Sequence, residues 1–340
     1  MRPKTHKRTI AEKFIWIIGL AMLVAIAALA EAPGSVVPPA FPSSSKNSST
    51  NAQQPISVTS ELVAIPVSVT DSKGNFVPGL TKANFQIFEG NQPKEIALFE
   101  QEDTPVSIGL LVDHSGSMES KLTNVVAAIS GFTQASNPQD EMFVVNFGDQ
   151  ARVETFGGKA FTSDPVEIRM AVSLAAEGKT ALYDAVFAGL KHLRAARWQK
   201  QALVIVSDGG DNASWHKYPE VLEQARQSQV AIYAIGLVDE WGEEENPKIL
   251  EEMCKDTGGI VFFPHVPSAI VNATTTIARD LREQYMLGFV PEKGQTADLF
   301  HKIQVRVNEP ERGKLHVRSR PGYSVAGSEG SGADHLEGTP

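Results

Sequence analysis

Residues 106–118 have the sequence Val-Ser-Ile-Gly-Leu-Leu-Val-Asp-His-Ser-Gly-Ser-Met, and this stretch decides the fold class. Residues 106–112 form a nearly continuous apolar run, which is typical of a strand buried on both faces of a sheet. Asp113 follows the run directly, and a loop with two serines and a glycine comes next. An acidic loop at the carboxyl end of a buried strand indicates the ligand-binding edge of an open α/β sheet.

Short apolar runs alternate with helical patterns from residue 106 to residue 283. Strands alternating with helices indicate βα units and a mostly parallel sheet. The sequence therefore predicts an α/β domain over residues 103–285, with a doubly wound sheet and helices on both faces. The predicted strands are 106–112, 142–145, 202–206, 230–235 and 260–263, and the predicted helices are 122–132, 166–176, 182–195, 220–227, 247–254 and 267–283.

Two segments with period-two alternation, residues 56–102 and 286–325, flank this domain. The first is too small to be expected to fold alone. We expect the two segments to pair with each other as a small β-sandwich, with the α/β domain inserted between them. Residues 31–55 are rich in Pro, Ser, Asn and Gln, which predicts a disordered linker. Residues 326–340 are predicted to be a flexible tail.

The N-terminal 30 residues have the pattern of a targeting segment. A basic head precedes a charge-free apolar run at residues 14–30, which ends with Ala28-Leu29-Ala30. Small residues at this position favour a cleaved export signal. An uncleaved membrane anchor is the alternative. Both interpretations place the rest of the chain outside the cytoplasm, as a secreted, periplasmic or envelope-anchored protein that contacts a membrane only through this segment.

Charge and cysteine content exclude several classes of protein. The chain has 31 Lys and Arg against 40 Asp and Glu, and its basic head makes the remainder still more acidic. An acidic body without a basic patch is not expected to bind nucleic acid. The single cysteine, Cys254, excludes a disulfide scaffold. The eight histidines have no metal-ligand spacing, so zinc is not expected.

Oxygen-bearing side chains lie in three separate loops at the predicted edge. Asp113, Ser115 and Ser117 follow the first strand, Asp208 follows the strand at 202–206, and Thr180 lies in a loop that enters a helix. Each group alone is typical of a helix cap or turn. Together they form an all-oxygen set, which suits a hard cation such as Mg²⁺, with Mn²⁺ or Ca²⁺ as alternatives.

This set resembles the metal-ion-dependent adhesion site of the von Willebrand factor type A (VWFA) family, over about residues 104–285. The resemblance implies that Ser115, Ser117 and Thr180 contact the metal directly and that Asp113 and Asp208 bind it largely through water. It also implies that a carboxylate of the ligand completes the coordination shell.

Motifs in the flanks extend this likeness, and the chain resembles the exported VWFA-related proteins of acidobacterial type. The resemblance informs the architecture more than the activity. The motifs are Val67-x-Val-Thr-Asp71, Tyr285-Met-Leu-Gly-Phe-Val-Pro291 and Arg318-x-Arg-Pro-Gly-Tyr323.

We expect an exported binding or adhesion module that captures an acidic side chain of a protein partner through the metal, and no enzyme. Lys179, Asp211 and Trp215 are candidate ligand-binding residues. A metal-dependent hydrolase is one alternative, but it needs a general base. His114 and His216 are the nearby candidates, and neither belongs to a recognisable catalytic constellation. A VWFA domain with a purely structural metal is the other alternative.

Overall fold

The computed structural model describes residues 62–324, apart from residue 102 and residues 240–244 and 293–299. The described residues belong to one compact unit that begins at Val58. The predicted export segment, the linker and the tail lie outside the described residues. None of the helices in the described part of the chain has the length and hydropathy needed to cross a membrane.

A six-stranded sheet forms the centre of the α/β domain. The apolar run of the sequence becomes β5, which is buried along its whole length. Parallel pairing joins β5 to β6 and β8, β8 to β9, and β9 to β10, and β7 pairs antiparallel with β6 at the edge. The strand order is β10 (Val261–Phe262), β9 (Ala231–Gly236), β8 (Gln201–Ser207), β5 (Ser107–Asp113), β6 (Glu141–Phe147) and β7 (Ala151–Val153).

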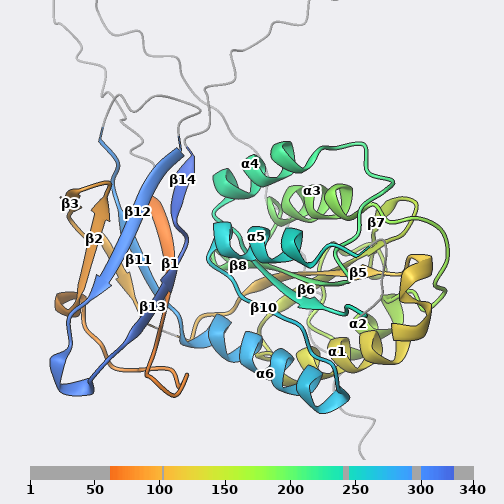
Figure 1. Ribbon diagram of the computed structural model, residues 1–340, viewed down its shortest axis with the longest axis horizontal. Helices are drawn as coiled ribbons and strands as arrows, with labels where there is room; N and C mark the ends of the chain where they lie inside the picture. Colours follow the sequence, from red (N-terminus) through yellow and green to blue (C-terminus); the bar gives the residue numbers. More distant parts are fainter. Residues whose placement is uncertain (1–61, 102, 240–244, 293–299, 325–340) are drawn as a thin grey trace, which may run out of the picture. The chain divides into compact units, whose positions relative to one another are not determined.

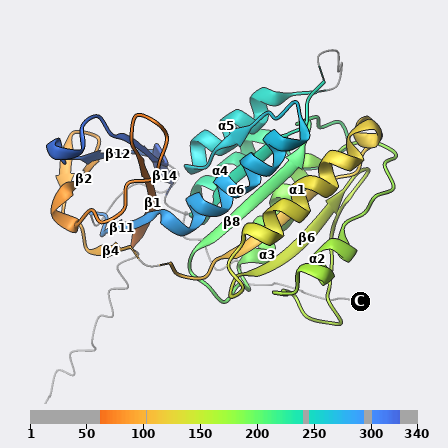
Figure 2. The same cartoon turned by 90° about the horizontal axis from the view of Figure 1, so that it is seen from below.

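The described chain has six α-helices. Helices cover both faces of this sheet, as Figures 1 and 2 show. One face carries α1 (Leu122–Ala135), α2 (Pro165–Ala171) and α6 (Pro267–Glu283), and the other carries α3 (Leu182–Leu193), α4 (Tyr218–Ser228) and α5 (Pro247–Thr257). A 3-10 helix, η2 (Gly116–Lys121), precedes α1. The predicted fold class, a doubly wound and mostly parallel α/β sheet, is therefore confirmed.

One local prediction within this domain was wrong, and one short strand was not predicted. The helix predicted at 166–176 ends at Ala171, because Val172 adopts an extended backbone. The side-chain amide of Asn146 fixes this end, since it donates to the Ala171 carbonyl at 2.7 Å and accepts from the Ser173 N–H at 2.9 Å. Strand β7 was not predicted, because three residues are too short to show alternation.

The flanking segments form two four-stranded sheets around a second apolar core, which is the predicted small β-sandwich. Strands from both flanks share each sheet, since β1 pairs with β11 and β13, and β2 pairs with β12. The core includes Ile65, Val67, Ile87, Leu287 and Phe289. One sheet has the order β13 (His316–Ser319), β1 (Val63–Thr70), β11 (Tyr285–Phe289) and β4 (Leu98–Glu100), and the other has β14 (Gly322–Ser324), β12 (Phe300–Val307), β2 (Phe85–Glu89) and β3 (Gln92–Lys94).

A buried carboxylate joins the sandwich to the α/β domain. Asp280 of α6 is fully buried, and it accepts hydrogen bonds from Ser68 Oγ of β1 at 2.5 Å and from Arg318 Nη2 of β13 at 2.6 Å. Tyr233 of β9 and Gln284 donate to the same carboxylate at 2.7 and 3.0 Å. One carboxylate thus receives donors from both parts, which ties the strands of the sandwich to the last helix of the α/β domain.

Candidate metal centre

The carboxylate of Asp113 lies at the carboxyl end of the central strand and is fully buried. Its Oδ1 accepts from the Ser115 N–H at 2.9 Å and from Ser115 Oγ at 2.6 Å, and its Oδ2 accepts from Ser207 Oγ at 2.6 Å. Burial raises the pKa of Asp113 to about 6, although the hydrogen bonds from Ser115 and Ser207 lower it. These donors are neutral, so they leave the charge of the carboxylate uncompensated.

The two serines of the Asp-x-Ser-x-Ser loop face each other. Ser115 Oγ lies 3.2 Å from Ser117 Oγ, and Ser115 is the N-cap residue of η2. The backbone N–H of Gly116 donates to the carbonyl of Gly178 at 3.1 Å. This bond attaches the serine loop to the loop that carries Thr180, so two of the three predicted loops are in direct contact.

Thr180 and Asp208 share a cavity with Ser117. This cavity has a volume of about 190 Å³, and Asp211 and Asn212 also line it. Asn212 Oδ1 accepts from the Thr180 N–H at 2.8 Å, while the Thr180 carbonyl accepts from the N–H groups of Asn212 and Ala213. The structure therefore brings side chains from all three predicted loops to one small cavity.

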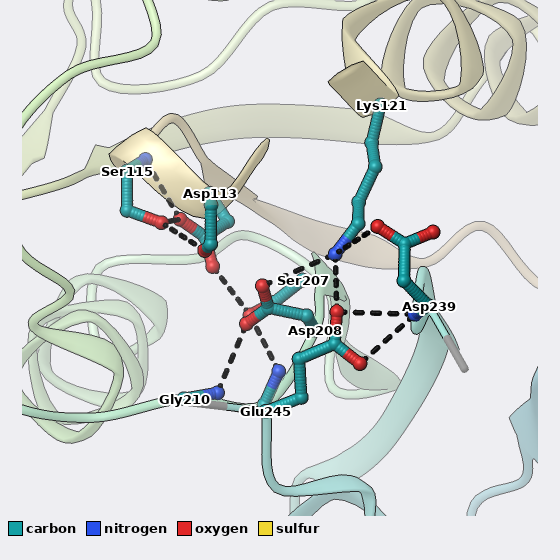
Figure 3. Close-up of polar contacts among 10 residues, drawn as sticks. Asp113, Ser115, Lys121, Ser207, Asp208, Gly210, Asp239 and Glu245 are labelled. Atoms are coloured by element: carbon teal, nitrogen blue, oxygen red, sulfur yellow. Dashed lines mark hydrogen bonds and ion pairs between the residues drawn. The ribbon is translucent and has the colours of Figure 1, made fainter. Parts of the chain in front are cut away.

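The carboxylate of Asp208 has a cationic neighbour, Lys121, that we did not predict. Figure 3 shows the ammonium of Lys121 among Asp208, Asp239 and Glu245. Lys121 Nζ lies 3.4 Å from Asp208 Oδ2, 3.5 Å from Asp239 Oδ2 and 2.6 Å from Glu245 Oε1. Burial lowers the pKa of Lys121, but its hydrogen bond to Glu245 and the charge of Asp208 raise the pKa more, so it lies above the usual value.

The chemistry of these residues fits a hard divalent cation. Within the described ranges, no three His, Cys, Asp or Glu side chains cluster to hold a metal. A cation at this edge would therefore depend on the hydroxyls of Ser115, Ser117 and Thr180 beside the carboxylates of Asp113 and Asp208. Hydroxyl and carboxylate oxygens are the ligands that Mg²⁺ prefers. A cation would also offset the buried charge of Asp113.

The three candidate ligand-binding residues differ in their surroundings. Trp215 is 87% exposed, and its backbone N–H donates to Asp184 Oδ2 at 3.0 Å. Asp211 lines the small cavity, but its Oδ2 accepts from the Tyr183 N–H, which holds the start of α3. Lys179 is exposed, and its backbone N–H donates to Asp149 Oδ1 at 2.7 Å. Trp215 and Lys179 thus project from loops that are fixed through their backbones.

The two histidines are held in separate surroundings. Nδ1 of His216 lies 2.6 Å from Asp184 Oδ1, and its ring stacks on Phe187 with a centroid separation of 3.8 Å. The ring of His114 lies against Gly148, since a Cβ added there would lie 2.9 Å from its Cε1. In the described chain, neither imidazole hydrogen-bonds a residue that lines the small cavity.

Sequence reasoning missed Ser207 and Lys121. Ser207 lies between the predicted strand at 202–206 and Asp208, and its hydrogen bond to Asp113 crosses between neighbouring strands. Lys121 had a usable signal, because acidic residues follow the strand at 230–235, among them Asp239 and Glu245. Several carboxylates at one edge of a sheet require a counter-charge.

A comparison with known protein families agrees with this architecture. Residues 107–275 match the family model of the von Willebrand factor type A domain. No curated protein matches the chain. A solved structure of a von Willebrand factor type A protein from Catenulispora acidiphila is 14% identical, with a TM-score of 0.47, and the similarity covers 71% of this chain and 76% of that chain.

Two further solved structures come from Bacteroides species. An aerotolerance-related membrane protein from Bacteroides fragilis is 16% identical, with a TM-score of 0.43. The conserved hypothetical protein BatB from Bacteroides thetaiotaomicron is 18% identical, with a TM-score of 0.40. Each similarity covers 52% of this chain and 98% of the other chain.

Proposed function

Residues 107–275 belong to the von Willebrand factor type A family, and from this premise we propose that the chain is an exported, cation-dependent binding module for acidic groups of a protein partner. Domains of this family are protein-interaction and adhesion modules in general. The metal dependence, the acidic partner and the export are the parts that we add to this general role.

The observation that carries the proposal is the surroundings of Asp113. Its carboxylate is fully buried and surrounded by neutral hydroxyl donors, while Ser117, Thr180 and Asp208 line the adjoining cavity. In this proposal Ser115, Ser117 and Thr180 hold the cation, and Asp113 and Asp208 balance its charge. A bound Mg²⁺ would supply the positive charge that attracts a carboxylate of the partner.

The exposed residues around the cavity supply partner contacts in this proposal. Trp215 offers a large apolar surface on a fixed loop, and aromatic side chains of this kind dominate binding energies at interfaces. Lys179 adds an exposed positive charge that attracts an acidic partner. Asp211 contributes indirectly, because it holds the start of α3 beside Thr180.

Catalysis is not part of the proposal, because in the described chain neither nearby histidine hydrogen-bonds a residue that lines the small cavity. His216 is paired with Asp184 and stacked on Phe187, and the ring of His114 lies against Gly148. A hydrolase would need a general base within reach of the cation. Hydrolysis of phosphoester or peptide substrates that disappears in His114→Ala would contradict this part of the proposal.

Defined peptides test the binding function directly. Peptides with a central Asp, and matched peptides with Asn at that position, are immobilised and incubated with the protein in Mg²⁺ or EDTA. We expect Mg²⁺-dependent binding to the Asp peptides only, and loss of that binding in Asp113→Ala. Equal binding to the Asp and Asn peptides, or binding that persists in EDTA, would overturn the proposal.

Export rests on residues 14–30, which lie outside the described residues. Cell fractionation of the full chain and of a variant without residues 1–30 tests it. We expect the full chain outside the cytoplasm and the shortened variant inside. The same location for both would contradict export by this segment.

A further inference from the structure

A second cavity, of about 560 Å³, lies far from the candidate metal centre. Lys200 lines it and directly precedes β8, whereas Asp208 directly follows that strand. A strand rises about 3.3 Å per residue, so the two ends of β8 are on the order of 20 Å apart. The cavity also has the size of a typical small-molecule site. It is therefore separate from the cation site and large enough for a ligand.

The ammonium of Lys200 is a buried cation with unused donors. The residue is 9% exposed, and within the described part of the chain its ammonium makes no hydrogen bond or ion pair. Burial lowers the pKa of Lys200 to about 8, although three more distant carboxylates raise it. A buried lysine without a partner is rare, because desolvation of its charge is unfavourable. An anion in the cavity would satisfy this group.

The three carboxylates that act on Lys200 from a distance have closer partners of their own. They belong to Asp280, Asp103 and Asp140. Asp280 pairs with Arg318, and Asp103 pairs with Arg282. Asp140 accepts hydrogen bonds from backbone N–H groups. Their negative charges reduce the free energy needed to bury the Lys200 ammonium, but they do not accept hydrogen bonds from it.

Trp198 contributes a second unpartnered donor to the same region. It lines the cavity, and its indole Nε1 is buried without a hydrogen-bond partner in the described chain. A buried tryptophan N–H usually has a partner, because an unsatisfied donor is costly. Trp198 and Lys200 thus both line this cavity, and the side-chain donor of each lacks a partner in the described chain. Donors of this kind favour an anionic acceptor.

Several of the side chains that line the cavity are apolar. These side chains come from β1 and the residue before it, from β4 and β11, and from the segment that leads into β5. They are Leu62, Ala64, Leu98, Pro105 and Met286. Glu100 also lines the cavity, but it is exposed, so solvent screens its charge. A ligand that accepts hydrogen bonds from the unpartnered donors and also packs against the apolar side chains has an anionic head and an aliphatic body.

We propose that this cavity binds a small amphipathic carboxylate. The carboxylate accepts hydrogen bonds from the Lys200 ammonium, and the aliphatic chain packs against the wall formed by Leu62, Leu98 and Met286. The sandwich supplies most of the apolar wall and the α/β domain supplies the cation, so the ligand contacts both parts of the chain. This site is independent of the proposed cation-dependent binding.

The test compares octanoate with 1-octanol, which has the same chain length and no charge. Binding to the full-length protein is measured at pH 7 by titration calorimetry, for the wild type, for Lys200→Met and for Lys191→Met. Lys191 lies on α3 and is exposed, so its variant is the matched control for loss of a lysine charge. Octanoate can form charge-assisted hydrogen bonds with Lys200, and octanol cannot. We therefore expect octanoate to bind at least about tenfold more tightly than octanol.

We expect Lys200→Met to lose this preference and to bind octanol with unchanged affinity, which also shows that the variant is folded. Lys191→Met should behave as the wild type. Three results would overturn the proposal. They are no saturable binding of octanoate, equal affinity of the wild type for both probes, and binding of octanoate to Lys200→Met with wild-type affinity.

Discussion

The hydroxyl of Ser207 donates to Oδ2 of Asp113 at 2.6 Å, and both residues are fully buried. This bond joins the carboxyl ends of β8 and β5, the neighbouring strands that carry the two acidic residues of the candidate metal centre. The orientation of Asp113 is therefore set by the adjacent strand as well as by its own loop. Residues behind a metal ligand commonly tune its affinity in this way.

Replacement of Ser207 by alanine should weaken Mg²⁺ binding, because Asp113 then loses one of the donors that orient it. Loss of an outer partner typically lowers metal affinity by about tenfold or more. Calorimetric titration with Mg²⁺ measures the change. Ser107→Ala is the matched control, since Ser107 is equally buried at the other end of β5 and bonds Glu141. Equal Mg²⁺ affinity in both variants and the wild type would show that the Ser207 bond has no role in the site.

Replacement of Lys121 by methionine should have the opposite effect on Mg²⁺ affinity. The Lys121 ammonium lies 3.4 Å from Asp208 and repels a cation bound there. The site is mostly buried, so the loss of a positive charge this close to Asp208 should strengthen Mg²⁺ binding by at least about tenfold. The metal-free variant should be less stable, because Glu245 loses its ion pair at 2.6 Å. Weaker Mg²⁺ binding by Lys121→Met would instead indicate that the lysine organises the site.

The junction between the sandwich and the α/β domain should depend on Asp280. Asp280→Asn removes the charge opposite Arg318 and leaves a mostly buried cation without its counter-ion, which typically costs about 3–5 kcal/mol of unfolding free energy. Urea unfolding measures this loss. Glu283→Gln on the same helix is the control, because its pair with Arg279 is exposed and contributes less than about 1 kcal/mol. Similar small losses in both variants would argue against a structural role for Asp280.

Lys200 should make the stability of the wild type depend on pH in the alkaline range. Its folded pKa is about 8, against 10.5 for the unperturbed side chain. Between these values the unfolded chain binds more protons than the folded chain, so stability rises with pH through this window. The full effect is about 3 kcal/mol relative to Lys200→Met. Urea unfolding at several pH values, without added carboxylate, measures this pH dependence. The same pH dependence of the unfolding free energy in the wild type and in Lys200→Met would contradict the burial of this charge.

The sequence predicted the parts of the fold that depend on pattern alone. The apolar run at 106–112 predicted the buried strand β5, and the helix predicted at 267–283 is α6. The same logic placed Asp113 and Asp208 at one edge of the sheet, because parallel strands end together. The structure brings these residues close through Ser207, and it places Ser117, Thr180 and Asp208 around one cavity.

What the sequence did not predict depends on contacts between distant side chains. Lys121 and Glu245 are far apart in sequence, and their ion pair has no local pattern. The early end of α2 follows from the amide of Asn146, which lies on another strand. The cavity beside Lys200 is lined by residues of the sandwich and by residues near the start of β8. No periodicity in the sequence predicts a cavity between them.

The central claim is that Asp113 belongs to a divalent-cation site, and Mg²⁺ titration of the purified wild type and of Asp113→Ala tests it most directly. Asp256→Asn is the control, because Asp256 pairs with Arg226 away from the site. Thermal melting shows that each variant is folded. The account predicts saturable Mg²⁺ binding in the wild type and in Asp256→Asn, and its loss in Asp113→Ala. Wild-type Mg²⁺ affinity in a folded Asp113→Ala variant would contradict it.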